Sequence, residues 1–216
     1  MTTRVAAGVD LIELDLFYDY NCPFVYRSVQ MLEKVRASGE RDVSVNWRFF
    51  SLTQVNHLQE PDGPPWTVWA APESEPVEGR LAFRAAEAAR RQDAFAPFHV
   101  ALLDARHRDR LDIESLEVIE RVARDSGMGL DRFRRDLADP AILERLARDH
   151  TQARRVHGVF GTPTFVFPGG GSAYVRLARP PENGDAVRVF DHIVDIVRGE
   201  PGILEIKRPV RPAAAG

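Results

Sequence analysis

Residues 11–49 form the part of the sequence that most restricts the fold, because they predict a strand, a helix and a second strand joined by short links. Residues 11–19 alternate apolar and polar side chains, which is typical of a strand. The helix is indicated by apolar residues at intervals of three and four, namely Val25, Val29, Leu32 and Val35. Residues 43–50 alternate again as a second strand. Such a unit implies a right-handed crossover and a parallel pair of strands.

The rest of the chain predicts a run of helices first and strands again towards its end. A proline-rich segment is followed by helical patterns, predicted over residues 77–93, from Pro97, from a cap at Asp112 and from Pro140. Residues 164–167 and 173–177 then predict a hairpin, and a last helix ends at Gly199. The fold class is therefore α/β, with strands far apart in the sequence joined in one sheet. We expect a discontinuous domain over 9–55 and 156–200, a helical insertion over 56–155, and a flexible tail over 207–216.

Cys22 is the only cysteine in the chain, and it stands where the first strand gives way to the first helix. Proline is favoured at the first position of a helix, so Pro23 places Cys22 at the cap. Unpaired N–H groups and the helix dipole stabilise an anion there, and we expect this thiol to lose its proton readily. It has no partner for a disulfide within its own chain.

Composition excludes several functional classes. The chain has 216 residues, 44% of them hydrophobic and 28% charged, and its net charge of −3 gives no reason to expect nucleic acid or an anionic membrane as partner. We find no secretory signal and no apolar run of membrane-spanning length. A lone cysteine suits a reducing cytoplasm, which is the location we expect.

Two segments together resemble a known family. Residues 17–24 (FYDYNCPF) are similar to the active-site segment of the DsbA family of thioredoxin-fold proteins, and residues 159–166 (VFGTPTFV) to its loop with a cis-proline. The resemblance implies a thioredoxin fold, β-α-β followed by β-β-α, with an inserted all-helical domain. It implies that Cys22 is the catalytic nucleophile and that Pro163, preceded by Thr162, is the cis-proline. We expect Pro23, Phe24, Thr162 and Pro163 to bind substrate.

Val25 departs from the family pattern, because family oxidoreductases carry a second, resolving cysteine at this position. A mixed disulfide on Cys22 would then need an external thiol, such as glutathione or mycothiol, and no tightly bound cofactor. The expected partners are this thiol and a small-molecule or protein thiol or disulfide substrate. The oligomeric state stays open, a homodimer included.

In lacking the second cysteine, the chain also resembles a related branch, the kappa-class glutathione transferases and 2-hydroxychromene-2-carboxylate isomerases. These proteins use the helix N-terminus to hold the thiol of bound glutathione, often with serine at the Cys22 position. A glutathione- or mycothiol-dependent isomerase or transferase is therefore one alternative function. A non-catalytic protein that binds peptides or thiols is another.

The neighbours of Cys22 are less informative. Asp19 suits a solvated carboxylate at a strand end slightly better than a group that tunes the thiol. Phe24 and Tyr26 fit the wall of a site and ordinary helix packing equally well, while Trp66 and Trp69 are candidates for an apolar lid. The histidine spacings predict no metal site, and they favour surface or partly buried side chains.

Overall fold

A computed structural model describes residues 11–57 and 67–208. Its sheet has four strands: β1 (Leu11–Tyr18), β2 (Asp42–Phe49), β3 (Thr164–Val166) and β4 (Ser172–Tyr174). Their spatial order is β2-β1-β3-β4. Strands β1 and β2 are parallel, whereas β3 is antiparallel to both β1 and β4. The sheet thus joins the two ends of the sequence, and the predicted fold class is confirmed.

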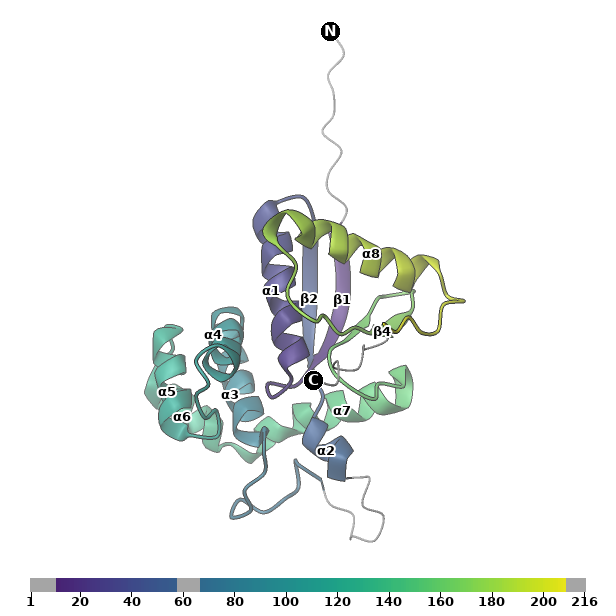
Figure 1. The fold of residues 1–216 in the computed structure, drawn as a ribbon. Coiled ribbons are helices and arrows are strands. Elements are labelled where there is room, and N and C mark those ends of the chain that lie inside the picture. Colours follow the sequence, from purple (N-terminus) through teal and green to yellow (C-terminus); the bar gives the residue numbers. More distant parts are fainter. Residues whose placement is uncertain (1–10, 58–66, 209–216) are drawn as a thin grey trace, which may run out of the picture.

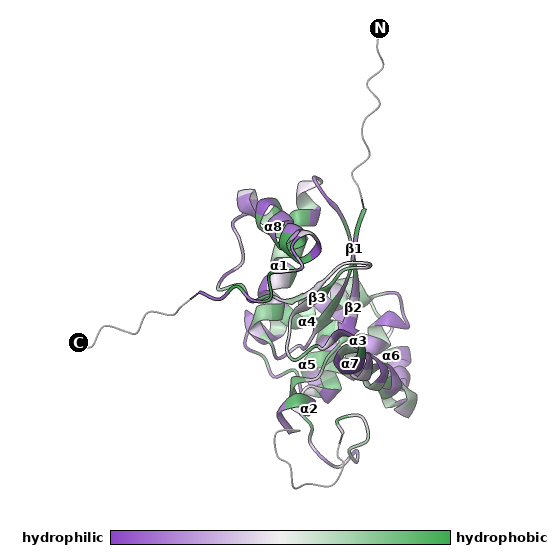
Figure 2. Cartoon of the chain, turned by 90° about the vertical axis from the view of Figure 1, so that its right-hand side faces the viewer, coloured by the Kyte–Doolittle hydropathy of each residue, from purple (hydrophilic) through white to green (hydrophobic). Residues whose placement is uncertain are grey.

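Two helices lie together on one side of this sheet. They are α1 (Pro23–Ser38) and α8 (Ala186–Gly199), which pack against each other (Figure 2). The four apolar residues predicted for the first helix are all buried, together with Ser28 and Met31, so the periodicity of the sequence identified the correct face. Because Gly39 adopts a left-handed φ of 69°, it ends α1 and lets the chain turn into β2.

The helices between β2 and β3 lie towards the C-terminal ends of the two parallel strands (Figure 1). They are α2 (Leu52–His57), α3 (Arg80–Arg90), α4 (Phe95–His107), α5 (Leu116–Asp125), α6 (Leu130–Ala138) and α7 (Leu143–His157). Helix α7 contacts β2, and α3 packs against its helical neighbours. In the described ranges this whole stretch contains helices and no strand. The domain boundaries drawn from the sequence stay a prediction.

Several predicted boundaries were wrong. Helix α5 begins at Leu116 instead of Asp112, whose carboxylate accepts from the Glu114 N–H at 2.9 Å in the preceding turn. Aspartate caps turns as readily as helices, which explains the error. Helix α3 begins at Arg80, three residues later than expected, and the short α2 was not predicted. The expected tail lies outside the described residues beyond Arg208.

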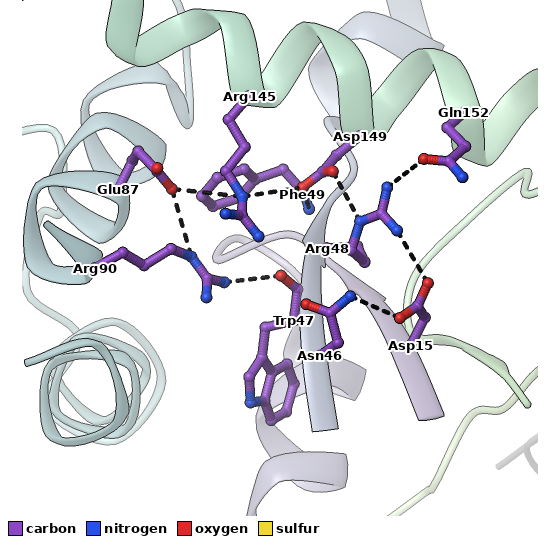
Figure 3. Close-up of polar contacts among 10 residues, drawn as sticks. All are labelled: Asp15, Asn46, Trp47, Arg48, Phe49, Glu87, Arg90, Arg145, Asp149 and Gln152. Carbon is purple, nitrogen blue, oxygen red and sulfur yellow. Dashed lines mark hydrogen bonds and ion pairs between the residues drawn. The ribbon is translucent and has the colours of Figure 1, made fainter. Parts of the chain in front are cut away.

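A polar network connects α7 to the two parallel strands (Figure 3). The carboxylate of Asp149 accepts from Arg48 Nε at 2.7 Å and from the backbone N–H of Phe49 at 3.1 Å. The same guanidinium group donates to Asp15 on β1 at 3.0 Å. Arg48 thereby links β1, β2 and α7, which fixes this helix against the end of the sheet where Cys22 lies.

Within residues 11–57 and 67–208, no helix combines the length and the apolar character that crossing a bilayer requires.

Candidate active site

Cys22 lies at the N-cap of α1, as the sequence predicts. Its backbone is extended, with φ −85° and ψ 113°, and Pro23 occupies the first helical turn. The thiol is 4% exposed, and its sulfur donates to the backbone carbonyl of Thr162 at 3.2 Å. The Cys22 N–H donates to the Asp19 carbonyl at 3.1 Å, which closes a tight turn between β1 and the helix. The sulfur is therefore held at the positive end of a 16-residue helix.

The partner of this thiol lies 140 residues further along the chain. The Thr162–Pro163 peptide bond is cis, and the segment enters β3 directly. Two contacts fix the loop: the Thr164 hydroxyl donates to the Gly161 carbonyl at 2.8 Å, and the Val175 N–H to the Pro163 carbonyl at 3.1 Å. The fold thus brings together Cys22, Thr162 and Pro163, three of the residues singled out in the sequence.

Thr162 also has a side-chain hydroxyl without a hydrogen-bond partner in the part of the chain that the structure describes. Its side chain is 2% exposed, and its hydroxyl oxygen has no hydrogen-bond partner among the described residues. Buried hydroxyls normally have partners, so an unpartnered one on the residue whose carbonyl meets the thiol is a candidate contact for a ligand.

The two residues after Cys22 differ in their surroundings. Pro23 is exposed, whereas Phe24 is half-buried. The guanidinium carbons of Arg27 and Arg176 lie 5.1 and 4.0 Å from the centre of the Phe24 ring. Both distances fall in the cation–π range. Sequence reasoning missed both arginines. Arg176 in particular comes from the distant segment after β4, which no local pattern connects to Phe24.

Val25 is fully buried in the apolar stripe of α1, and its N–H donates to the Cys22 carbonyl at 3.1 Å. It occupies the position one helical turn from the thiol. Because the chain has one cysteine in all, the site offers one sulfur for chemistry.

The interpretation of Asp19 as a solvated strand end was wrong. Its side chain is 1% exposed, and it accepts from the N–H groups of Asn21 at 2.9 Å and Leu52 at 2.8 Å. Burial raises the pKa of this carboxyl to about 6, although the two N–H donors oppose the rise. Asp19 therefore connects the turn before Cys22 to the start of α2.

Helix α4 supports the same turn from the other side. The Nε2 atom of His107 lies 2.8 Å from the Tyr20 carbonyl, so the proton belongs on this nitrogen. Burial lowers the pKa of His107, which keeps the ring neutral near pH 7. The His107 ring stacks on Tyr26 at 5.3 Å, and Tyr26 donates to Asp104 at 2.9 Å. Tyr26 thus joins α1 to α4.

Other expected neighbours lie elsewhere. Trp69 packs against His150, with ring centres 5.4 Å apart, and Trp66 falls outside the described residues. His99 and His150 are 2% and 3% exposed, so the expected surface or partly buried location was wrong for both. In the described ranges, no three His, Cys, Asp or Glu side chains are placed to hold a metal ion.

Comparisons with known proteins agree with this fold. The model of a family described as DSBA-like thioredoxin domain matches residues 13–182. An uncharacterized protein of Mycobacterium tuberculosis is 26% identical over 200 residues, which are 93% of this chain and 83% of that protein.

Solved structures show the same fold at low identity. A 2-hydroxychromene-2-carboxylate isomerase superposes with a TM-score of 0.60 at 16% identity, over 86% of this chain and 96% of its own. A probable DsbA oxidoreductase from Streptomyces coelicolor superposes with a TM-score of 0.54 at 19% identity, over 94% of both chains. The likeness therefore extends to both a redox protein and an isomerase.

Proposed function

Because the chain belongs to the family of DSBA-like thioredoxin domains, we propose that it is a thiol–disulfide oxidoreductase that works with one thiol, that of Cys22. The observation that carries this proposal is the pairing of Cys22 with the Thr162 carbonyl at 3.2 Å, while a buried valine stands where a resolving thiol would be. An external small thiol completes each cycle.

The reaction proceeds by two exchanges at one sulfur. Cys22 first gives up the proton that it donates to Thr162, and the N-terminus of α1 stabilises the thiolate. The thiolate attacks a disulfide RSSR′, which forms the mixed disulfide Cys22–SR and releases R′S⁻. An external thiolate R″S⁻ then attacks the R sulfur, forms RSSR″ and returns the Cys22 thiolate. The R′ half of the substrate is thus released as a thiol, and the R half leaves joined to the small thiol in the disulfide RSSR″.

Four residues hold the substrate in this proposal. Thr162 supplies the backbone carbonyl beside the sulfur and a buried hydroxyl without a partner among the described residues, and Pro163 shapes the loop that carries them. Phe24 and Pro23 form the apolar wall at the start of α1. Glutathione or mycothiol is the co-substrate, no cofactor is held between turnovers, and a reducing cytoplasm supplies the thiol. The disulfide substrate is a small molecule or a protein.

A second candidate function is an isomerase or transferase that binds a glutathione-like thiol as cofactor. Its supporting observation is Val25, because a site with one sulfur cannot complete a dithiol cycle within the chain, whereas binding of a thiol cofactor needs no second sulfur. Cys22 would then hold the cofactor thiol without forming a disulfide. A protein that binds peptides without catalysis is the remaining alternative. In that case the Cys22→Ala variant would bind peptides as well as the natural protein does.

Mass spectrometry tests the proposal directly. We expect the protein to gain one thiol adduct when incubated with oxidised glutathione or oxidised mycothiol, and to lose it on adding the reduced thiol. Cys22→Ser should gain none and should not reduce a model disulfide. An unmodified natural protein would contradict the proposal. If it then binds reduced glutathione, and Cys22→Ser does so equally, the second candidate is favoured.

A further inference from the structure

The rim of the site carries an arginine that has no acidic partner. Arg176 is exposed, and its guanidinium carbon lies 4.0 Å from the centre of the Phe24 ring. Arg27 contacts the same ring and donates to the Leu177 carbonyl at 2.9 Å. Among the described residues, neither arginine forms an ion pair with a carboxylate. Other arginines in the described ranges do pair with carboxylates, as Arg41 does with Asp191 at 2.8 Å.

Two connections link these cations to the segments that carry the thiol and its partner. Phe24 is two residues after Cys22 on the same helix start. Arg176 follows Val175, whose N–H donates to the Pro163 carbonyl in the loop that contacts the sulfur. Contacts of this kind thus join the segments that carry Cys22, Phe24 and Arg176.

Two exposed aromatic rings continue the rim. Tyr174 is 36% exposed and Phe160 62% exposed, and their ring centres lie 5.1 Å apart. The Tyr174 ring also lies against Gly161, where an added Cβ would approach it to 3.3 Å. Burial raises the pKa of Tyr174, the charge of Arg176 opposes the rise and that of Cys22 adds to it, which agrees with a position between these two residues.

From this arrangement we infer that the small thiol used at Cys22 carries a carboxylate, which Arg176 binds while the thiol reacts. A guanidinium group pairs well with a carboxylate, and one that stacks on Phe24 at the start of the helix that carries Cys22 fits an acidic thiol such as glutathione. Mycothiol bears no carboxylate, so it gains nothing from this contact. The inference rests on the proposed function and selects between its two co-substrates.

The test compares thiols that differ only in charge. Turnover of a model disulfide is measured with glutathione, with its diester, whose carboxylates are blocked, and with mycothiol. Arg176→Gln should raise the KM for glutathione about threefold, the effect of losing one exposed charge pair, and leave kcat unchanged. The KM values for the diester and mycothiol should not change. In the natural protein, high salt should reduce the difference in KM between glutathione and its diester.

Arg179→Gln is the matched control, because it removes the same charge from an exposed arginine three residues further along. It should leave all KM values unchanged. Equal effects of the two substitutions, or an equal effect of Arg176→Gln on glutathione and its diester, would overturn the inference. Cys22-dependent turnover with 2-mercaptoethanol, which is uncharged, reports on the proposed function separately. If that turnover is absent, glutathione binding to Cys22→Ser, with and without Arg176→Gln, still tests the carboxylate contact.

Discussion

The carboxyl of Asp19 shows how one buried group can affect the turn that presents Cys22. It accepts from two backbone N–H groups, one beside Cys22 and one at the start of α2. These bonds favour the ionised form, but burial favours the neutral acid and dominates. Asp19 is therefore held in place by its hydrogen bonds while its charge destabilises the folded state.

The raised pKa of Asp19, about 6 against 3.8 for an ordinary aspartate, gives a prediction about pH. Between these values the folded protein binds the proton more strongly than the unfolded chain does, so this group's contribution to stability falls as pH rises from about 4 to 6. Asp19→Asn cannot lose a proton. Its free energy of unfolding relative to the natural protein should therefore increase over this range, by on the order of 3 kcal/mol.

Urea unfolding at pH 4 and pH 7 measures this difference. Asp42→Asn makes the same change at an exposed position at the start of β2 and controls for the loss of a carboxylate in general. A difference between Asp19→Asn and the natural protein that does not change with pH would contradict the prediction.

Val25 gives a second prediction at this scale. Cys22 and position 25 lie one helical turn apart, within the range of about 4.4–6.8 Å between Cα atoms that a disulfide needs. Because cysteine is small and readily buried, Val25→Cys should disturb the apolar face of α1 little. The variant should form an internal disulfide and reduce insulin with dithiothreitol as the reductant. Two free thiols after oxidation, measured by alkylation and mass spectrometry, would favour the second candidate function.

At the scale of elements, α7 is attached to the sheet by a charged group that is almost fully buried. The side chains of Arg48 and Asp149 are 12% and 7% exposed, so little water screens their ion pair (Figure 3). Asp149 also satisfies the Phe49 N–H at the end of β2. Helix α7 leads into the loop that carries Thr162, so its position bears on the site.

Asp149→Ala should therefore destabilise the protein by about 3 kcal/mol, because it removes the acceptor of the buried Arg48 Nε–H and of the buried Phe49 N–H. Asp149→Asn keeps one acceptor oxygen and should have a smaller effect. Arg148→Ala, next to it on α7, breaks only an exposed pair with Glu144 and should change stability by less than about 0.5 kcal/mol. Urea unfolding gives all three values, and equal losses for Asp149→Ala and Arg148→Ala would contradict this account.

At the scale of the whole molecule, the sequence predicted what depends on local patterns. Alternation identified β1 and β2, the spacing of Val25 to Val35 identified the buried face of α1, and Cys22-Pro23 identified its start. The contacts that complete the site come from segments far apart. His107 and Arg176 reach it through tertiary packing, which no local period encodes. Helix α2 is too short for its period to stand out.

His150 is the point where three distant segments meet. It lies on α7, its Nδ1 atom accepts from the Ser51 N–H at 3.2 Å just after β2, and its ring packs on Phe50 and Trp69. The sequence suggested a surface or partly buried side chain, because nothing local to residue 150 indicates these partners.

The last prediction concerns acid stability and follows from the same contacts. Burial lowers the pKa of His150 from 6.5 to about 4, and a protonated ring could not accept from Ser51. The unfolded chain takes up the proton first, so the contribution of His150 to stability is present above about pH 6.5 and falls away towards pH 4. His150→Asn keeps an oxygen near the place of Nδ1 but cannot be protonated there. It should be less stable than the natural protein at pH 7, because it loses the ring packing on Phe50. The difference in free energy of unfolding between the two proteins should narrow by up to about 3 kcal/mol by pH 4.5. Urea unfolding at the two pH values would measure it. A gap of the same size at both would mean that the ring contributes by packing alone.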